Sequence, residues 1–162
     1  MTRNVTVNNC RFHSTAGWGV GLARIANATI TGCTFAARTP EAVHIEDGCT
    51  DVTMQHCSFV TTGPHAIHVL SGSQRVKVLD NTFDMSAAST GNAAILALYA
   101  LGAPTASGLP VGTPVVDLTI ERNRQTGGRH SLHAYSVDGL RMVGNAGMER
   151  VVIHSGSRVH IE

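Results

Sequence analysis

Apolar and polar residues alternate in a short motif that recurs along the chain. The motif first appears as NVTVNNCRF at residues 4–12, and it returns as NATITGCTF at residues 27–35 and DVTMQHCSF at residues 51–59. Further copies begin at residues 75, 117 and 139, and a shortened copy begins at residue 158. In every copy the second and fourth positions are apolar and the position between them is polar, which is typical of a strand that buries one face.

Two more short strands are predicted in each repeat. A second strand is predicted after each of the first six copies, at residues 19–23, 42–46, 66–70, 94–98, 131–135 and 151–155. Its predicted inward residues are Val20, Val43, Ile67, Ile95, Leu132 and Val152. A third strand is expected to carry Phe12, Phe35, Phe59 and Phe83.

The spacing of the repeats predicts how these strands pair. The cysteine or asparagine of the motif falls at positions 10, 33, 57, 81, 123 and 145, so the successive steps are 23, 24, 24, 42 and 22 residues. Each strand needs the same strand of the next repeat beside it, so the chain should coil into parallel sheets with rungs ~4.8 Å apart. We expect the asparagines to stack as a hydrogen-bonded ladder and the cysteines to be buried free thiols in the same turn.

The patterns V-x-[VI]-x-x-[NC]-x-F and [GA]-[VI]-x-[VI] resemble the right-handed parallel β-helix of the pectate-lyase-like superfamily. This resemblance implies an all-β fold, a right-handed parallel β-helix (solenoid) of about six to seven rungs that forms a single domain over residues 1–162. The step of 42 residues predicts one long inserted loop at about residues 99–115. Neither end carries a recognisable cap, so we expect a fragment of a larger protein, with flanking domains or a homotrimer covering the open solenoid ends.

Histidines dominate one predicted outward column. The polar position of the second strand holds His44, His68 and His133, and two positions further on stand Glu46 and Tyr135. The resemblance implies that this strand lines the substrate groove of a polysaccharide. The candidate catalytic residues are therefore His44, His68, Glu46 and Tyr135, and the candidate substrate-binding residues are Arg38, Arg129 and His133.

These residue types favour some reactions over others. Glycoside hydrolysis usually needs two carboxylates, and on this face only Glu46 qualifies. Elimination on a uronic acid, or C5 epimerisation, needs a base and a cation for the carboxylate. His44 or His68 suits the base, Tyr135 the proton donor, and Arg38 or Arg129 the cation. If the chain is an enzyme, a polysaccharide lyase or epimerase is favoured over a hydrolase.

Alternatives stay open at this stage. The histidines also fit a solvated sheet with no catalytic role, in a structural β-helix segment of a phage tailspike, adhesin or surface protein. We expect no metal or other cofactor. A metal ion on His44, His68 and Glu46 would need side chains from one flat sheet to close a tetrahedron. Calcium on Glu46, Asp47 and Asp51 is similarly conceivable. For Trp18, a place in the core or at the end of the coil is favoured over sugar stacking.

Composition narrows the partners and the location. Lys and Arg number 12 against 11 Asp and Glu, and a net charge of +1 provides no broad field for nucleic acid or an anionic membrane. No apolar run approaches the ~20 residues of a spanning helix, and residues 1–20 contain no signal-peptide core. The location therefore stays open, with an extracellular or virion-associated site implied only by the resemblance.

Overall fold

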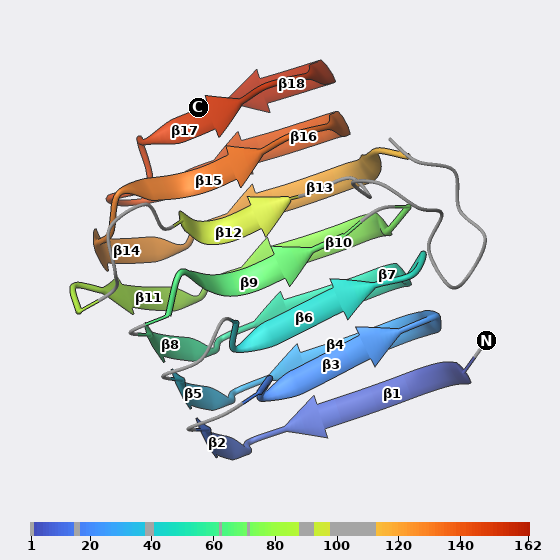
Figure 1. Ribbon diagram of the computed structural model, residues 1–162, viewed down its shortest axis with the longest axis vertical. Helices are drawn as coiled ribbons and strands as arrows, with labels where there is room; N and C mark the ends of the chain where they lie inside the picture. The colour runs from blue at the N-terminus through green and yellow to red at the C-terminus, as the bar shows by residue number, and fades with distance from the viewer. Residues whose placement is uncertain are drawn as a thin grey trace.

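The chain winds into a coil of parallel strands (Figure 1). The computed structural model describes residues 2–14, 17–37, 41–61, 63–70, 72–87, 93–97 and 113–162. In this part of the chain the regular elements are strands, which form sheets of seven, five and six strands. No helix in these ranges is long and apolar enough to cross a membrane.

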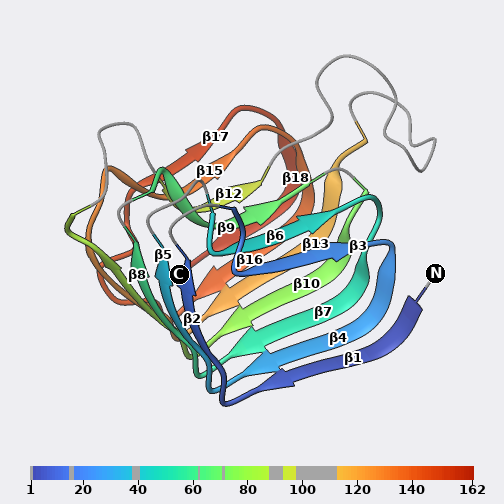
Figure 2. The same ribbon diagram turned by 60° about the horizontal axis from the view of Figure 1, so that its bottom comes forward.

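Three sheets form the sides of the coil (Figure 2). The long sheet contains β1 (Thr2–Asn8), β4 (Ile25–Thr31), β7 (Thr50–Gln55), β10 (Gln74–Leu79), β13 (Val115–Glu121), β16 (Val137–Val143) and β18 (Gly156–Ile161). The short sheet contains β2 (Arg11–Ser14), β5 (Thr34–Ala37), β8 (Ser58–Thr61), β11 (Thr82–Met85) and β14 (Arg124–Gly127). The histidine sheet contains β3 (Val20–Ala23), β6 (Val43–Glu46), β9 (His65–Val69), β12 (Ala93–Ala97), β15 (His130–Ala134) and β17 (Val151–Ile153).

The strand register confirms the predicted parallel β-helix. On the long sheet Ile30 pairs with Met54, and Met54 pairs with Val78, as the repeat alignment predicts. All three side chains are fully buried. Like residues therefore lie above one another, and the core is a set of apolar columns that run along the coil.

The predicted third strand is present and carries a phenylalanine stack. Ring centroids of Phe12 and Phe35 lie 4.8 Å apart, and those of the next two pairs, Phe35–Phe59 and Phe59–Phe83, lie 4.9 Å apart. The planes are within 10° of parallel. The separation of parallel strands sets this distance, so each ring packs face to face on the ring of the next rung.

The corner between the long and short sheets depends on one left-handed residue per rung. The residue before each motif cysteine or asparagine has a positive φ, from 52° at Arg122 to 64° at Gly144. Where this residue is not glycine, the conformation costs roughly 1–2 kcal/mol. Asp80 and Arg122 are the left-handed residues of two neighbouring corners. Arg122 Nε donates to Asp80 Oδ1 at 2.8 Å, and this contact between rungs offsets part of the conformational cost.

An asparagine ladder follows this corner, as predicted. Asn81 Nδ2 donates to Asn123 Oδ1, and Asn123 Nδ2 donates to Asn145 Oδ1, each at 3.0 Å. The Asn123 side-chain oxygen also accepts the backbone N–H of Asn81 at 2.9 Å. In earlier rungs a cysteine takes the place of the asparagine. There the Cys33 Sγ accepts the backbone N–H of Cys10 at 3.4 Å.

Three predictions about the coil need correction. Leu132 pairs with Val151 rather than with the predicted inward residue Val152, because the connection before β17 is one residue shorter than the alignment assumed. β13 begins at Val115, so the inserted loop ends before that residue, and residues 99–112 of the predicted loop lie outside the described residues. All four cysteines are free, as predicted, but Cys10 is exposed rather than buried.

The ladder predicts a large loss of stability on truncation. Asn123→Ala removes the acceptor of two donors on Asn81 and the amide that donates to the backbone carbonyl of Val78. Because these groups are buried, we expect the free energy of unfolding in urea to fall by about 2–4 kcal/mol. The exposed Lys77→Ala on β10 should change it by less than about 0.5 kcal/mol. Equal losses in the two variants would contradict the role of the ladder.

The cysteines should differ in reactivity. Burial raises the pKa of Cys57 to about 11 and also raises the pKa of Cys49, whereas Cys10 is exposed. We therefore expect one rapid reaction with a thiol-specific disulfide reagent in the folded protein, with the remaining thiols reacting only on unfolding. Cys10→Ser should remove the rapid phase and leave the slow one. A rapid phase that persists in Cys10→Ser would contradict the assignment.

Candidate functional site

The outward face of the histidine sheet brings most of the predicted site residues into one column. His44 pairs with His68, His68 with Leu96, and Leu96 with His133 on successive strands. Although the column points outward, it is not uniformly solvated. His44 is only 6% exposed and Leu96 only 7% exposed, so neighbouring groups cover this part of the face.

Glu41 organises the first part of the column, which we call the Glu41 cluster (Trp18, Glu41, His44, Glu46 and His68). Glu41 Oε1 lies 3.2 Å from His68 Nδ1, and Glu41 Oε2 lies 3.7 Å from His44 Nδ1. Nε2 of His44 lies 3.3 Å from Glu46 Oε2. The structure therefore places the predicted residues His44, His68 and Glu46 together, around a second carboxylate that the sequence reasoning did not select.

Trp18 covers this cluster. Its indole ring stacks on the imidazole of His44, with centroids 4.2 Å apart and planes 15° from parallel, and its Nε1 donates to Glu41 Oε2 at 2.9 Å. The side chain is nevertheless 49% exposed. A place in the core is therefore wrong for Trp18, whereas the predicted place at the end of the coil agrees with its position just before β3, the edge strand of the histidine sheet.

A second column of equivalent residues explains why Trp18 and Glu41 meet. Both residues stand two positions before the inward residue of their second strand, and so do His65, Ala93 and His130. The repeat spacing of 23 residues between Trp18 and Glu41 is the signal that finds this column. Trp18 and Glu41 lie outside the two predicted outward columns, which contain His44 and Glu46.

Burial and opposite charges set the proton affinities in the Glu41 cluster. Burial by itself would raise the pKa of Glu41, but the neighbouring His44 and His68 outweigh it and bring that pKa well below its usual range. Burial by itself would lower the pKa of His44, but Glu41 and Glu46 outweigh it and raise that pKa. The arrangement thus favours a carboxylate beside positive charge.

A separate aromatic stack lies further along the face and consists of His133, Tyr135 and His154. Ring centroids are 4.8 Å apart for His133 and Tyr135, 4.6 Å for Tyr135 and His154, and 5.1 Å for His133 and His154. The two Nε2 atoms of the histidines lie 2.9 Å apart, so one donates a proton that the other accepts. The structure does not bring Tyr135 to His44 or His68, because the Leu96 rung separates the two groups.

Sequence reasoning missed His154 for a physical reason. The alignment put Ile153 in the outward column after His133, whereas Val152 pairs with His133 in the structure. Residues 151–153 are apolar without alternation, so the pattern does not specify which side chain faces inward. The shift carries His154 to the position where it meets His133.

The predicted arginines contribute less to this geometry. Arg129 is exposed and directly precedes β15. Burial lowers the pKa of His130, and the positive charge of Arg129 lowers it further. Arg38 lies outside the described residues. Among the residues considered for calcium, Asp51 has both carboxylate oxygens bound by Arg75, at 2.7 and 2.8 Å, which leaves it poorly placed to bind an ion.

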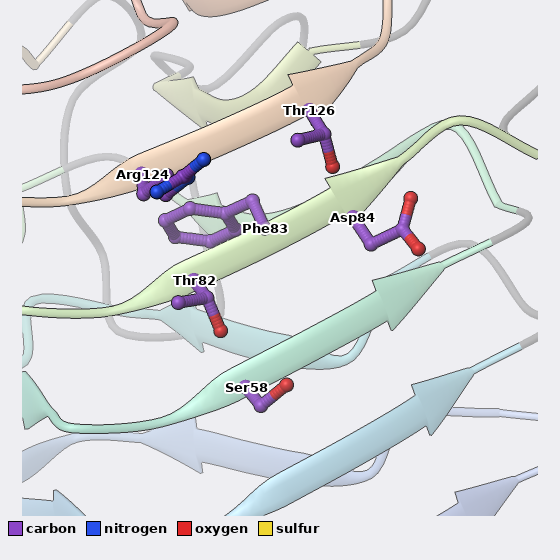
Figure 3. Close-up of a pocket in the computed structure, with 6 residues that line it drawn as sticks. All are labelled: Ser58, Thr82, Phe83, Asp84, Arg124 and Thr126. Atoms are coloured by element: carbon purple, nitrogen blue, oxygen red, sulfur yellow. The ribbon is translucent and has the colours of Figure 1, made fainter.

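A shallow pocket lies on a different side of the coil, over the short sheet (Figure 3). Ser58, Thr82 and Arg124 face it from three neighbouring strands, and Asp84 and Thr126 line its edge. Short hydroxyl side chains beside a long arginine leave the hollow. It contains none of the predicted site residues.

The aromatic stack predicts an acid-sensitive contribution to stability. Burial lowers the pKa of His133, and the nearby His154 and His130 lower it further. A histidine whose pKa is lower in the folded state stabilises fully above its ordinary pKa of 6.5 and loses that contribution as the pH falls. His133→Gln should therefore weaken the decline of the unfolding free energy between about pH 7.5 and about pH 5.

The control for this measurement is His13→Gln, which removes an exposed histidine from β2 on the short sheet. Its pH profile should follow that of the unaltered protein. A His133→Gln profile that is equally steep would show that His133 does not carry the effect.

Comparison with known families agrees with this geometry. A family model described as the right handed beta helix region matches residues 1–83, and no curated protein matches the chain significantly. The matched segment is more than half of the 162 residues, and the same parallel pairing continues through β18. The chain therefore belongs to the right-handed β-helix family.

Proposed function

We propose that this β-helix recognises a polysaccharide along the outer face of the histidine sheet, with lyase- or epimerase-type chemistry at the aromatic stack. The observation that carries the proposal is Trp18, a half-exposed indole held flat on His44 and hydrogen-bonded to Glu41. A ring fixed in this way loses little freedom when a sugar ring stacks on it.

The length of the face supports a chain-like ligand. The histidine sheet runs from β3 to β17, which at the usual strand separation covers about 24 Å. Trp18 lies near one end of this face, and the aromatic stack lies near the other. Between them the side chains are imidazoles, carboxylates and Leu96, a mixture of polar and apolar groups that suits sugar rings with their hydroxyl groups.

The aromatic stack suits proton transfer. The lowered pKa of His133 keeps its imidazole neutral and therefore basic near neutral pH, and the Tyr135 ring lies 4.8 Å away. In elimination, His133 takes the C5 proton of a uronate, the C4=C5 double bond forms, and the bond from C4 to its oxygen breaks. Tyr135 donates its proton to that leaving oxygen. In epimerisation, a proton returns to C5 from the opposite side.

This proposal assigns the base to His133 in place of His44 or His68. The reason is proximity, because the base and the acid must act on neighbouring atoms of one sugar. His133 and Tyr135 share one strand face, two residues apart, whereas His44 and His68 lie beyond Leu96. Arg129, which precedes β15, is the cation on the same end of the face.

The competing function is a non-catalytic structural segment. The regular phenylalanine and asparagine ladders support it, since they would keep the coil stiff between other domains. The two functions differ in whether the histidine face binds and alters a polysaccharide.

Fluorescence of the only tryptophan tests recognition. Titration with a panel of acidic and neutral polysaccharides should shift the Trp18 emission for at least one acidic member. In an affinity gel that holds the same polysaccharide, Trp18→Ala should weaken binding about ten-fold, equivalent to roughly 1.4 kcal/mol. Lys77→Ala on the long sheet should bind normally. Absence of binding across the panel would overturn the proposed recognition.

Ultraviolet absorbance of unsaturated uronate tests elimination, and deuterium uptake at C5 from heavy water tests epimerisation. Both His133→Gln and Tyr135→Phe should abolish whichever activity is found, while binding in the gel is retained. Binding without product or deuterium uptake would leave recognition standing and remove the catalytic part. Turnover that survives in both variants would place the chemistry elsewhere.

A further inference from the structure

The Glu41 cluster contains three ligand groups that converge from different parts of the coil. His44 and His68 come from neighbouring strands of the histidine sheet, whereas Glu41 comes from the segment that precedes β6. One ligand atom from each lies within 4.8 Å of the other two, and all three residues are largely buried. This removes the objection that side chains of one flat sheet run parallel, because the third group enters from the side.

The hydrogen bonding within this group is incomplete. Nδ1 of His44 is buried and has no hydrogen-bond partner among the described residues, whereas Nδ1 of His68 contacts Glu41 Oε1 at 3.2 Å. Nδ1 of His44 faces Glu41 Oε2 at 3.7 Å, which is too long for a hydrogen bond. A buried polar nitrogen without a partner, such as Nδ1 of His44, is costly and calls for a group that satisfies it.

The distances fit ligands of one metal ion. Two ligand atoms about 2.0–2.1 Å from a tetrahedral ion are separated by about 3.3 Å. The Glu41–His68 separation is 3.2 Å and the Glu41–His44 separation is 3.7 Å. The three ligand atoms lie within 4.8 Å of one another, so closure onto an ion needs side-chain rotations that bring the two imidazoles nearer to each other.

The surrounding groups are arranged as outer partners of such a site. The Trp18 indole donates to Glu41 Oε2 and holds the carboxylate, while Glu46 Oε2 lies 3.3 Å from Nε2 of His44. A ligating histidine usually donates its other ring N–H to a carboxylate in this way, which directs Nδ1 toward the metal. Two imidazoles and one carboxylate favour zinc and its neighbours over calcium or magnesium.

We propose that Glu41, His44 and His68 bind a divalent transition-metal ion, best matched by Zn²⁺, with Trp18 and Glu46 holding the ligands in place. Three protein ligands leave a fourth position open for water or an external group. The site is separate from the aromatic stack, so it stands or falls independently of the polysaccharide chemistry.

The test uses the full chain after treatment with a chelator. Titration with ZnCl₂ in a calorimeter should give one ion per chain and raise the thermal unfolding temperature, whereas CaCl₂ should do neither. CoCl₂ should produce visible d–d absorption without a thiolate charge-transfer band, which separates this site from the free cysteines. It should also quench Trp18 fluorescence, because the indole bonds to a ligand, and chelator should restore the emission.

Variants assign the ligands. Glu41→Gln and His68→Gln should each weaken Zn²⁺ binding more than 100-fold, and Glu46→Gln should weaken it about ten-fold through His44. The matched control, His154→Gln, removes a histidine from the same face outside the cluster and should bind normally. Far-UV circular dichroism checks that each variant is folded.

Two results would overturn the proposal. One is the absence of saturable Zn²⁺ or Co²⁺ binding by the folded, unaltered protein, a measurement that does not depend on any variant folding. The other is undiminished binding in folded Glu41→Gln and His68→Gln, which would assign the ion to cysteines or to the exposed histidines.

Discussion

In-register pairing of each strand with the same strand of the next rung is the constraint on which the structure depends. Parallel pairing fixes the vertical distance between equivalent residues, so any residue type that repeats in the sequence becomes a column in space. Apolar columns fill the interior, and Phe35 on Phe59 shows how closely they stack. The asparagine ladder satisfies the buried polar groups at a corner where strand pairing alone cannot.

The same constraint assembles the outer face. A histidine that recurs once per rung meets another histidine, and the residue three positions before it meets its own equivalents. Because the two columns run side by side, Glu41 reaches both His44 and His68. The residue types in these columns change from rung to rung. This change is what makes the Glu41 cluster chemically different from the aromatic stack.

Sequence alone was sufficient for the parts of the structure that alternation and repetition determine together. The column of Ile30, Met54 and Val78 has both signals, and the structure has the same register. The segment that begins at Val151 has no alternation, because three apolar residues in succession do not distinguish the inward from the outward face. The predicted register was therefore one residue off, and His154 was assigned to the wrong face. Trp18 and Glu41 lie before their strands, where alternation no longer applies, so only the repeat spacing relates them. Which side chains then touch depends on ring orientation and burial, and these follow from packing rather than from periodicity.

The change from cysteine to asparagine along one corner divides the coil into two mechanical regions. From Asn81 onward each corner is joined to the next by amide hydrogen bonds, whereas between Cys10 and Cys33 the seam consists of a weaker contact to sulfur. Thermal opening of the backbone therefore begins more easily in the cysteine-bearing turns, and the later turns act as the rigid anchor. Trp18 and Glu41 belong to the softer region, so the indole stack on His44 and the hydrogen bond to Glu41 supply there the order between rungs that the amide ladder supplies further along.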